Sequence, residues 1–284
     1  MISIILILLF VFSVLSVPVC HGVISGLYLY GMKIFPGLFI SFILTNILVR
    51  ILQQKNINNP WILVITGLMT GFPNGAYICS WYNKNNPENR LGDMLAGIIN
   101  IPSPAFLISY VYINILEKCI SLPMFLALTY TPVILCSYMA ILLFRDKNNK
   151  KDNAPHIKND KKLIFHFFEE AVDSSINTAL KLGAYVIIFS VIVNIIMHFS
   201  QSNTAGLLIS YLFEISNGLA IIKNAGIPMN ITVLLTVLLD AFGGVCIIMQ
   251  TKSICSSYIS IKKYIYQKLV LCIRSEERRV GKEG

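Results

Sequence analysis

The chain has 284 residues, of which 55% are hydrophobic and 13% charged, with a formal net charge of +9. This composition excludes an ordinary soluble domain and predicts an all-α polytopic membrane protein. The basic residues cluster in short loops between apolar segments, and no nucleic-acid motif accompanies them. We therefore attribute the positive charge to membrane topology and contact with lipid, and expect no nucleic-acid partner.

The first half is predicted to hold residues 1–144. Residues 1–20 form an N-terminal transmembrane helix. A signal peptide is the alternative, but the segment lacks a basic start and an A-x-A cleavage site. Residues 21–144 then form a first repeat, with continuous spans at 23–49 and 123–144, a short apolar segment at 61–80 and a span at 93–112 that contains two prolines.

A basic, Asn-rich linker at 145–162 precedes the second repeat, residues 163–273. An amphipathic segment at 163–181 leads into a span at 177–199, a short apolar segment at 207–222 and a span at 227–250. The apolar segment at 264–273 is too short to cross a bilayer. We therefore predict a truncated last helix, followed by a tail at 274–284 that is not native.

Polar, glycine-bearing breaks interrupt the apolar stretches at corresponding places in the two halves. The first pair is residues 71–76 and 214–220, and the second pair is residues 100–106 and 240–244. Lipid cannot hydrogen-bond a freed backbone, so broken helices at membrane depth line a protein cavity. A matched pair of such segments indicates a transporter binding site.

The basic loops predict the orientation. If the most basic segment, 145–162, is cytoplasmic, the best sorting of the other loops makes both short segments re-entrant hairpins, one entering from each side. The two halves are then inverted repeats, each with a re-entrant hairpin and a broken helix. In this arrangement the N-terminus is inside, Lys118 falls outside and Lys223 is the one misplaced residue. The basic residues that fall inside, besides those of 145–162, are Arg50, Lys55, Lys84, Arg90, Lys252, Lys262 and Lys263.

Substrate-binding candidates lie at the breaks, where exposed N–H groups at half-helix ends could face an anionic carboxylate. The alternative is that these residues only satisfy the backbone groups that a kink in the helix leaves unbonded. The candidates are Gly71, Pro73, Asn74, Gly75, Asn100, Ser103, Ser216, Asn217 and Gly218.

Three charged residues lie within apolar segments. Burial of a carboxylate in a membrane costs about 2.5–3.5 kcal/mol, so Glu214 and Asp240 are candidates for coupling to an ion, or are paired with another group. Lys33 could attract an anion, or extend to the interface. Gln250 is expected at the cytoplasmic interface.

The seven cysteines and four histidines have no metal-ligand spacing, and no hydrolase or Walker motif is present. We therefore expect no metal, no cofactor and no enzymatic activity.

The motifs, taken in order, resemble those of a known family. Residues 33–39 resemble V-F-P-x-L-x-P-F, residues 66–76 resemble G-x-x-S-G-Y-P-x-G-A and residues 100–106 resemble N-x-S-x-P-x-F. In the second half, residues 214–218 resemble E-x-T-x-G and residues 242–250 resemble F-G-G-x-x-x-x-x-Q. The chain is similar over residues 26–263 to the YlbJ-like (SpoVV-like) sporulation integral membrane proteins, built from nucleoside-recognition or Gate domains. Its central region is shorter and its last helix is cut short.

The resemblance implies a multi-pass protein of the outer forespore membrane, in the mother cell, that moves dipicolinic acid toward the spore. A structural or assembly protein of that membrane and a nucleoside carrier are the alternatives. Whether the chain forms a homo-oligomer stays open.

Overall fold

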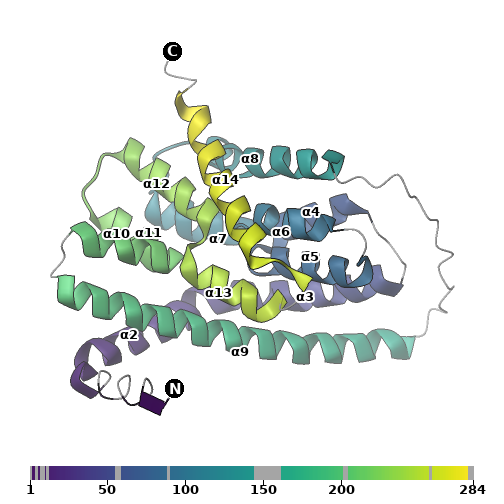
Figure 1. Ribbon diagram of the computed structural model, residues 1–284, viewed down its shortest axis with the longest axis horizontal. Coiled ribbons are helices and arrows are strands. Elements are labelled where there is room, and N and C mark those ends of the chain that lie inside the picture. The colour runs from purple at the N-terminus through teal and green to yellow at the C-terminus, as the bar shows by residue number, and fades with distance from the viewer. Residues whose placement is uncertain are drawn as a thin grey trace.

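The computed structural model describes residues 2–3, 6, 10, 13–54, 59–87, 90–143, 161–200, 204–255 and 258–280, and the regular structure in them is entirely helical (Figure 1). Four helical segments are long and apolar enough to cross a membrane, and a bent pair makes a fifth if it is one span. The prediction of an all-α, multi-span membrane protein is confirmed at this level. The four are Leu91–Ile115, Leu122–Leu143, Phe168–Ser200 and Met229–Cys255.

The N-terminal region contains α2 (Ser16–Tyr28), the π-helix η1 (Leu29–Ile34) and α3 (Phe35–Gln54). The chain bends by 57° between Ser16–Ile34 and Leu38–Leu52. The boundary predicted after residue 20 is not there, because α2 continues through it. Gly22 and Gly26 lie on one face of α2, where Cβ atoms would approach the backbone of α9 to 2.5 and 2.8 Å. These glycines therefore allow the two helices to pack closely.

The rest of the first half begins with a helical hairpin. Helices α4 (Pro60–Thr70) and α5 (Asn74–Asn85) pack against each other. A broken helix follows, made of α6 (Leu91–Ile99), α7 (Pro104–Phe106) and the π-helix η2 (Leu107–Ile115). Helix α8 (Leu122–Leu143) completes this half.

The second half has the same order of elements. The long helix α9 (Lys161–Ser200) precedes a packed pair, α10 (Thr204–Phe213) and α11 (Ile215–Asn224). The broken helix α12 (Met229–Phe242) and α13 (Gly244–Cys255) leads to α14 (Ile261–Val280). All four predicted interruptions are therefore present in the structure, at 71–73, 100–103, 214 and 243.

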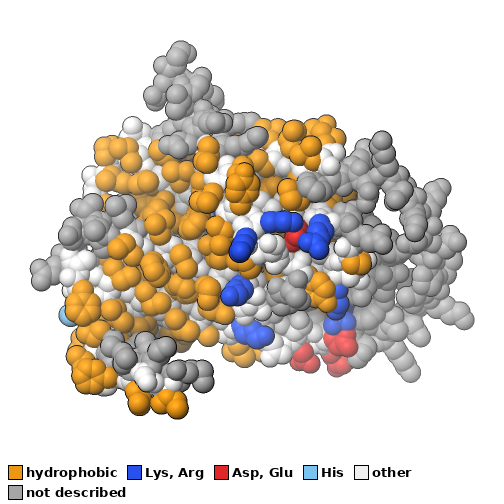
Figure 2. All heavy atoms as spheres, viewed as in Figure 1, with side chains coloured by type: hydrophobic (Ala, Val, Ile, Leu, Met, Phe, Trp, Pro, Cys, Tyr) orange, Lys and Arg blue, Asp and Glu red, His pale blue; other side chains and the backbone are white. Residues whose placement is uncertain are grey.

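Basic side chains gather where α5 and α13 end and α6 and α14 begin. We call this region the basic end; its residues are Lys84, Arg90, Lys252, Lys262 and Lys263. Figure 2 shows Lys and Arg side chains concentrated in one part of a face that is otherwise mostly hydrophobic. A wide apolar surface of this kind is expected where lipid surrounds the protein.

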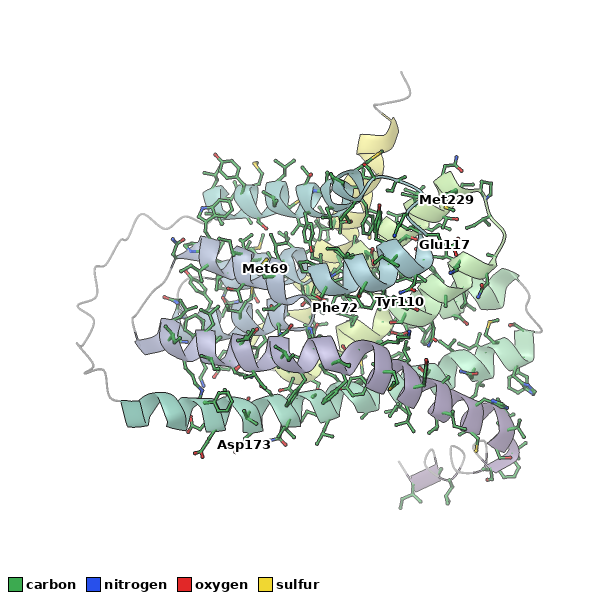
Figure 3. All side chains as sticks on the ribbon, turned by 180° about the vertical axis from the view of Figure 1, so that it is seen from behind. Met69, Phe72, Tyr110, Glu117, Asp173 and Met229 are labelled. Atoms are coloured by element: carbon green, nitrogen blue, oxygen red, sulfur yellow. The ribbon has the colours of Figure 1, made fainter. Side chains whose placement is uncertain are left out.

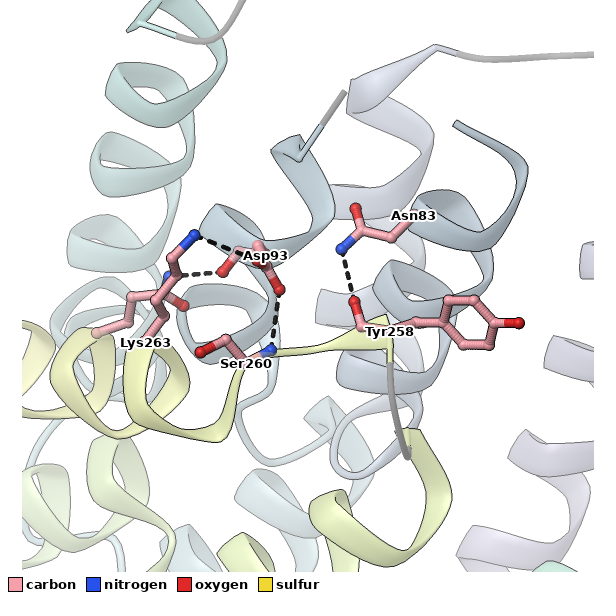
Figure 4. A network of polar contacts seen from close by, with 6 residues as sticks. Asn83, Asp93, Tyr258, Ser260 and Lys263 are labelled. Atoms are coloured by element: carbon pink, nitrogen blue, oxygen red, sulfur yellow. Dashed lines mark hydrogen bonds and ion pairs between the residues drawn. The ribbon is translucent and has the colours of Figure 1, made fainter. Parts of the chain in front are cut away.

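Polar contacts of Asp93 hold the basic end together (Figure 4). Its carboxylate accepts a hydrogen bond from the backbone N–H of Ser260 at 3.0 Å and forms an ion pair with Lys263 at 3.3 Å. The amide of Asn83 donates to the carbonyl oxygen of Tyr258 at 2.9 Å. These contacts fasten the start of α14 to α5 and α6.

The far end of the broken helix α6–η2 contains a second group of charges. Lys223, at the end of α11, forms an ion pair with Glu117 at 2.8 Å and donates to the carbonyl oxygen of Asn114. Lys118 follows Glu117 in the same loop. Lys223, predicted to be the misplaced residue, thus lies beside the loop that contains Lys118, away from the basic end.

Helix α14 continues to Val280 and so extends beyond Ile273, the predicted end of the apolar segment. Its first part is a structural element, because Tyr264 and Lys268 are fully buried against the rest of the chain. That the tail is not native stays a prediction. Residues 145–160 of the predicted linker lie outside the described residues.

Candidate functional site

A cavity of about 170 Å³ lies where the interrupted segments of the two halves meet. The first half contributes residues from η1, α3, the α4–α5 break, the break before α7, α7 itself and η2. The second half contributes residues from α9, the α10–α11 break and the first turns of α13. Its lining residues are Tyr30, Lys33, Ile34, Leu38, Phe72, Pro102, Ser103, Ala105, Phe106, Ser109, Leu182, Val186, Glu214, Ile215, Ser216, Ile247 and Gln250.

In the first half, the hairpin break and the helix break are joined directly. The backbone N–H of Phe72 donates to the carbonyl oxygen of Ile101 at 2.9 Å. Gly71 has a φ of 74° and its hydrogen faces Ser103 so closely that a Cβ would lie 2.4 Å from the Ser103 nitrogen. Only glycine fits this combination of positive φ and close approach. The Ser103 hydroxyl accepts from the N–H of Phe106 at 3.3 Å and thereby caps α7.

The second half repeats this juxtaposition. A Cβ on Gly244, at the α12–α13 break, would lie 3.2 Å from the carbonyl oxygens of Leu212 and Phe213 at the end of α10. Glu214 is buried, and its carboxylate accepts from the N–H of Asn217 at 2.7 Å, which caps α11. Each half therefore presents a capped helix N-terminus to the cavity, that of α7 and that of α11.

Aromatic rings cover one side of the cavity. Phe72 and Phe106 have centroids 6.4 Å apart, and Phe106 and Tyr110 have centroids 5.2 Å apart. Phe72 and Tyr110 are close together in the view from behind (Figure 3). The Tyr110 hydroxyl donates to the carbonyl oxygen of Ser216 at 3.0 Å and so connects η2 to the start of α11. These rings give the cavity an apolar wall between two polar helix ends.

Lys33 is the one basic residue in the cavity lining. It belongs to the π-helix η1, and π-helices are rare elements that occur frequently at functional sites. The Lys33 side chain is exposed, and it forms no hydrogen bond or ion pair with any other residue that the structure describes. Within the described part of the chain, its ammonium group is therefore available to an anion.

Four of the predicted residues line the cavity: Lys33, Ser103, Glu214 and Ser216. Seven others lie in or beside the breaks without lining it. The amide of Asn217, for example, donates to the Ser190 hydroxyl at 3.3 Å, and Gly218 packs on the carbonyl oxygen of Tyr211. These seven are Gly71, Pro73, Asn74, Gly75, Asn100, Asn217 and Gly218.

Asn100 has its polar atoms occupied by contacts within the protein. Its side-chain oxygen accepts from the N–H of Ala76 at 3.2 Å, and its amide donates to the hydroxyl oxygens of Tyr264 at 2.7 Å and Thr251 at 3.3 Å. The residue is fully buried. It therefore joins α5, α13 and α14 at the break.

Asp240 lies apart from the cavity, near the end of α12. It is fully buried, and neither carboxylate oxygen has a hydrogen-bond partner among the described residues. Tyr130 of α8 and Tyr211 of α10 lie close to it. The Tyr130 hydroxyl is likewise without a partner in the described part of the chain.

Several residues that line the cavity were not predicted from the sequence. Gln250 was expected at the interface, but it is buried in the cavity wall and donates to Cys246 Sγ at 3.2 Å. Phe72 lies within the first predicted break, so the helix-breaking residues on either side of it mark its position in the sequence. Tyr30 and Leu182 lie on uninterrupted helical segments whose sequence carries no such signal. In the described residues, no group of three or more His, Cys, Asp or Glu side chains could hold a metal ion.

Comparison of the chain with protein-family models, curated proteins and solved structures finds no match. The resemblance to the sporulation family therefore depends on the motifs alone.

Proposed function

We propose that this protein is a membrane carrier of a small anionic metabolite, and that the substrate is dipicolinate. The observation that carries the proposal is the cavity between the interrupted segments, with Lys33 as the one basic residue in its lining. In secondary transporters, substrate sites lie between structural repeats and are formed by broken helices. The substrate itself comes from the motif resemblance.

The arrangement of the two hairpins supports two inverted Gate-like repeats. Helix α5 ends at the basic end, whereas α11 ends at Lys223 beside the opposite loop. The breaks at Phe72 and Glu214 nevertheless meet at the same cavity. Two hairpins that enter from opposite sides and meet in the middle have this geometry. Under this proposal both are re-entrant, and rocking of the halves exposes the cavity to each side in turn.

The cavity has the chemistry to hold an aromatic anion. Lys33 supplies a positive charge, and the N-terminus of α7, which continues into η2, supplies the positive end of a helix dipole. The rings of Phe72 and Phe106 offer a flat apolar wall. Glu214 caps α11 through the N–H of Asn217, so part of its charge is already engaged there.

Asp240 is the candidate for coupling transport to a proton. An unpaired carboxylate in an apolar interior is strongly disfavoured, whereas the protonated acid is tolerated. Because both oxygens lack partners in the described residues, the carboxyl group can gain or lose a proton without breaking a fixed ion pair. Alternating access would carry that proton between the two sides.

The test is uptake by liposomes that contain the purified protein. Dipicolinate should enter protein-containing vesicles faster than empty ones, and unlabelled dipicolinate should compete. Nucleosides form the second arm: uptake of a nucleoside without dipicolinate uptake would favour the nucleoside carrier. No uptake of either solute, together with spores that lack the gene but contain normal dipicolinate and defective cortex, would favour the structural or assembly role.

A further inference from the structure

Lys268 is a charged residue that the proposed transport cycle does not use. It lies on α14 and is fully buried. Its ammonium group donates to two backbone carbonyl oxygens, those of Asn100 and of Ala241, the latter at 3.0 Å. Among the described residues it forms no ion pair, although Asp240 is the residue next to Ala241. The head group is thus bonded to two carbonyl oxygens and, among the described residues, to no carboxylate.

The two carbonyls belong to the same kind of place in each half. Asn100 is the C-cap of α6, where the first broken helix is interrupted. Ala241 is in the last turn of α12, before the second interruption at Gly243. The last carbonyls of a helix lack partners within it and carry the negative end of the helix dipole. Lys268 therefore joins the negative ends of two half-helices, one from each half.

The ring of Tyr264 completes this environment. The Lys268 nitrogen lies 5.7 Å from the centroid of that ring, within the range of a cation–π contact. Tyr264 is in turn held by Asn100 at 2.7 Å. Carbonyl oxygens and an aromatic face are ligands for a monovalent cation. In carriers with broken helices, such half-helix C-termini coordinate the Na⁺ that drives transport.

We propose that the Lys268 ammonium is a tethered cation that occupies the place of such a sodium ion. The protein then needs no Na⁺ to hold its two broken helices together, and its transport is independent of sodium. This inference rests on the proposed function for the transport part only. Its structural part concerns the folded protein alone and can be tested without any substrate.

The experiment compares thermal unfolding of the full chain in detergent, in sodium chloride, methylammonium chloride and choline chloride at equal ionic strength. For the wild type we expect the same Tm in all three salts. Lys268→Ala should unfold about 5 °C or more lower in choline chloride, and sodium or methylammonium should raise its Tm, because each fits the emptied space. Lys268→Met is the matched control: it fills the space without charge, so its Tm should be lowered and equal in all three salts.

A wild-type Tm that rises in sodium relative to choline would overturn the proposal, as would a Lys268→Ala protein that responds to neither small cation. If Lys268→Ala cannot be purified in choline chloride, purification in sodium or methylammonium chloride is the same test. Recovery there supports the proposal and failure there contradicts it. These results do not depend on uptake, so loss of the carrier function and loss of the tethered cation are distinguishable.

Discussion

The side-chain amide of Asn100 donates a hydrogen bond to the phenolic oxygen of Tyr264 at 2.7 Å, which links the break of the first broken helix to the last helix of the second half. Both residues are fully buried. The Thr251 hydroxyl of α13 lies within 3.5 Å of the same phenolic oxygen. Side chains of the second half therefore bond the Asn100 side chain at the interruption, and the two halves depend on each other for stability.

Tyr264→Phe should lower the stability of the protein. It removes the hydroxyl and leaves one Asn100 donor buried without its partner, which costs about 1–3 kcal/mol. Tyr258→Phe is the control, because Tyr258 is partly exposed and contributes its backbone carbonyl to the contact with Asn83. Thermal unfolding in detergent should show a lower Tm for the first variant only. Equal Tm values for the two variants would mean that the Asn100 contact contributes nothing.

Gly71→Ala should disrupt the cavity. The new methyl group would lie 2.4 Å from the Ser103 nitrogen. Alanine would also have to adopt a φ of 74° and a ψ of −173°, a region that is essentially restricted to glycine and costs about 1–3 kcal/mol before any clash. Uptake and Tm should both fall. Gly31→Ala is the matched control, since a Cβ there meets nothing within 4 Å and replacing glycine in a helix adds stability. A fully active Gly71→Ala protein would show that the backbone at the α4–α5 break can shift without loss of transport.

Lys33→Gln should weaken binding of an anionic substrate about tenfold, which corresponds to about 1.4 kcal/mol. The substitution removes the positive charge from the cavity lining and keeps a side chain of similar length. Lys84→Gln, at the exposed end of α5, removes the same charge far from the cavity and should leave binding unchanged. Dipicolinate titration of the two purified proteins measures the difference. Equal affinities would remove Lys33 from the site.

Asp240→Asn should abolish uptake driven by a pH gradient while the protein stays folded. The amide has the size of the acid but cannot release a proton, and it places no charge in the apolar interior. Its Tm should equal or exceed that of the wild type. Asp173→Asn is the control, because Asp173 is exposed on α9, where its side chain points away from the protein (Figure 3). Unchanged gradient-driven uptake in Asp240→Asn would place proton coupling elsewhere.

Much of the secondary structure could be predicted because its signals are local. Glycine, proline and asparagine within an apolar run favour a helix break, and three of the four interruptions lie at such residues. The other lies at Glu214, and Asn217 and Gly218 of the same segment are inside α11. The boundary predicted after residue 20 shows where local signals mislead. Residues 20–23 look like a loop in isolation, yet Gly22 packs on Val191 and the helix continues. That contact joins residues far apart in the sequence.

The candidate site could be predicted only in part. Ser103 and Glu214 lie at breaks and line the cavity, but Asn100 and Asn217, which have the same sequence features, bond within the protein. At a break, the direction of a side chain depends on the helices that pack around it. Tyr30 and Leu182 enter the site from continuous helices, so no local pattern marks them.

The sequence by itself determined that this is an all-α, multi-span membrane protein with paired helix interruptions, because apolar runs and helix breakers act through the backbone nearby. Only the tertiary structure decided which interrupted ends meet. It brought Phe72 and Glu214 to one cavity, left Asp240 outside it, and placed Lys268 between the ends of two half-helices. These placements arise from packing between segments that are 27 residues apart for Lys268 and Ala241 and 168 apart for Lys268 and Asn100, which a local pattern does not encode.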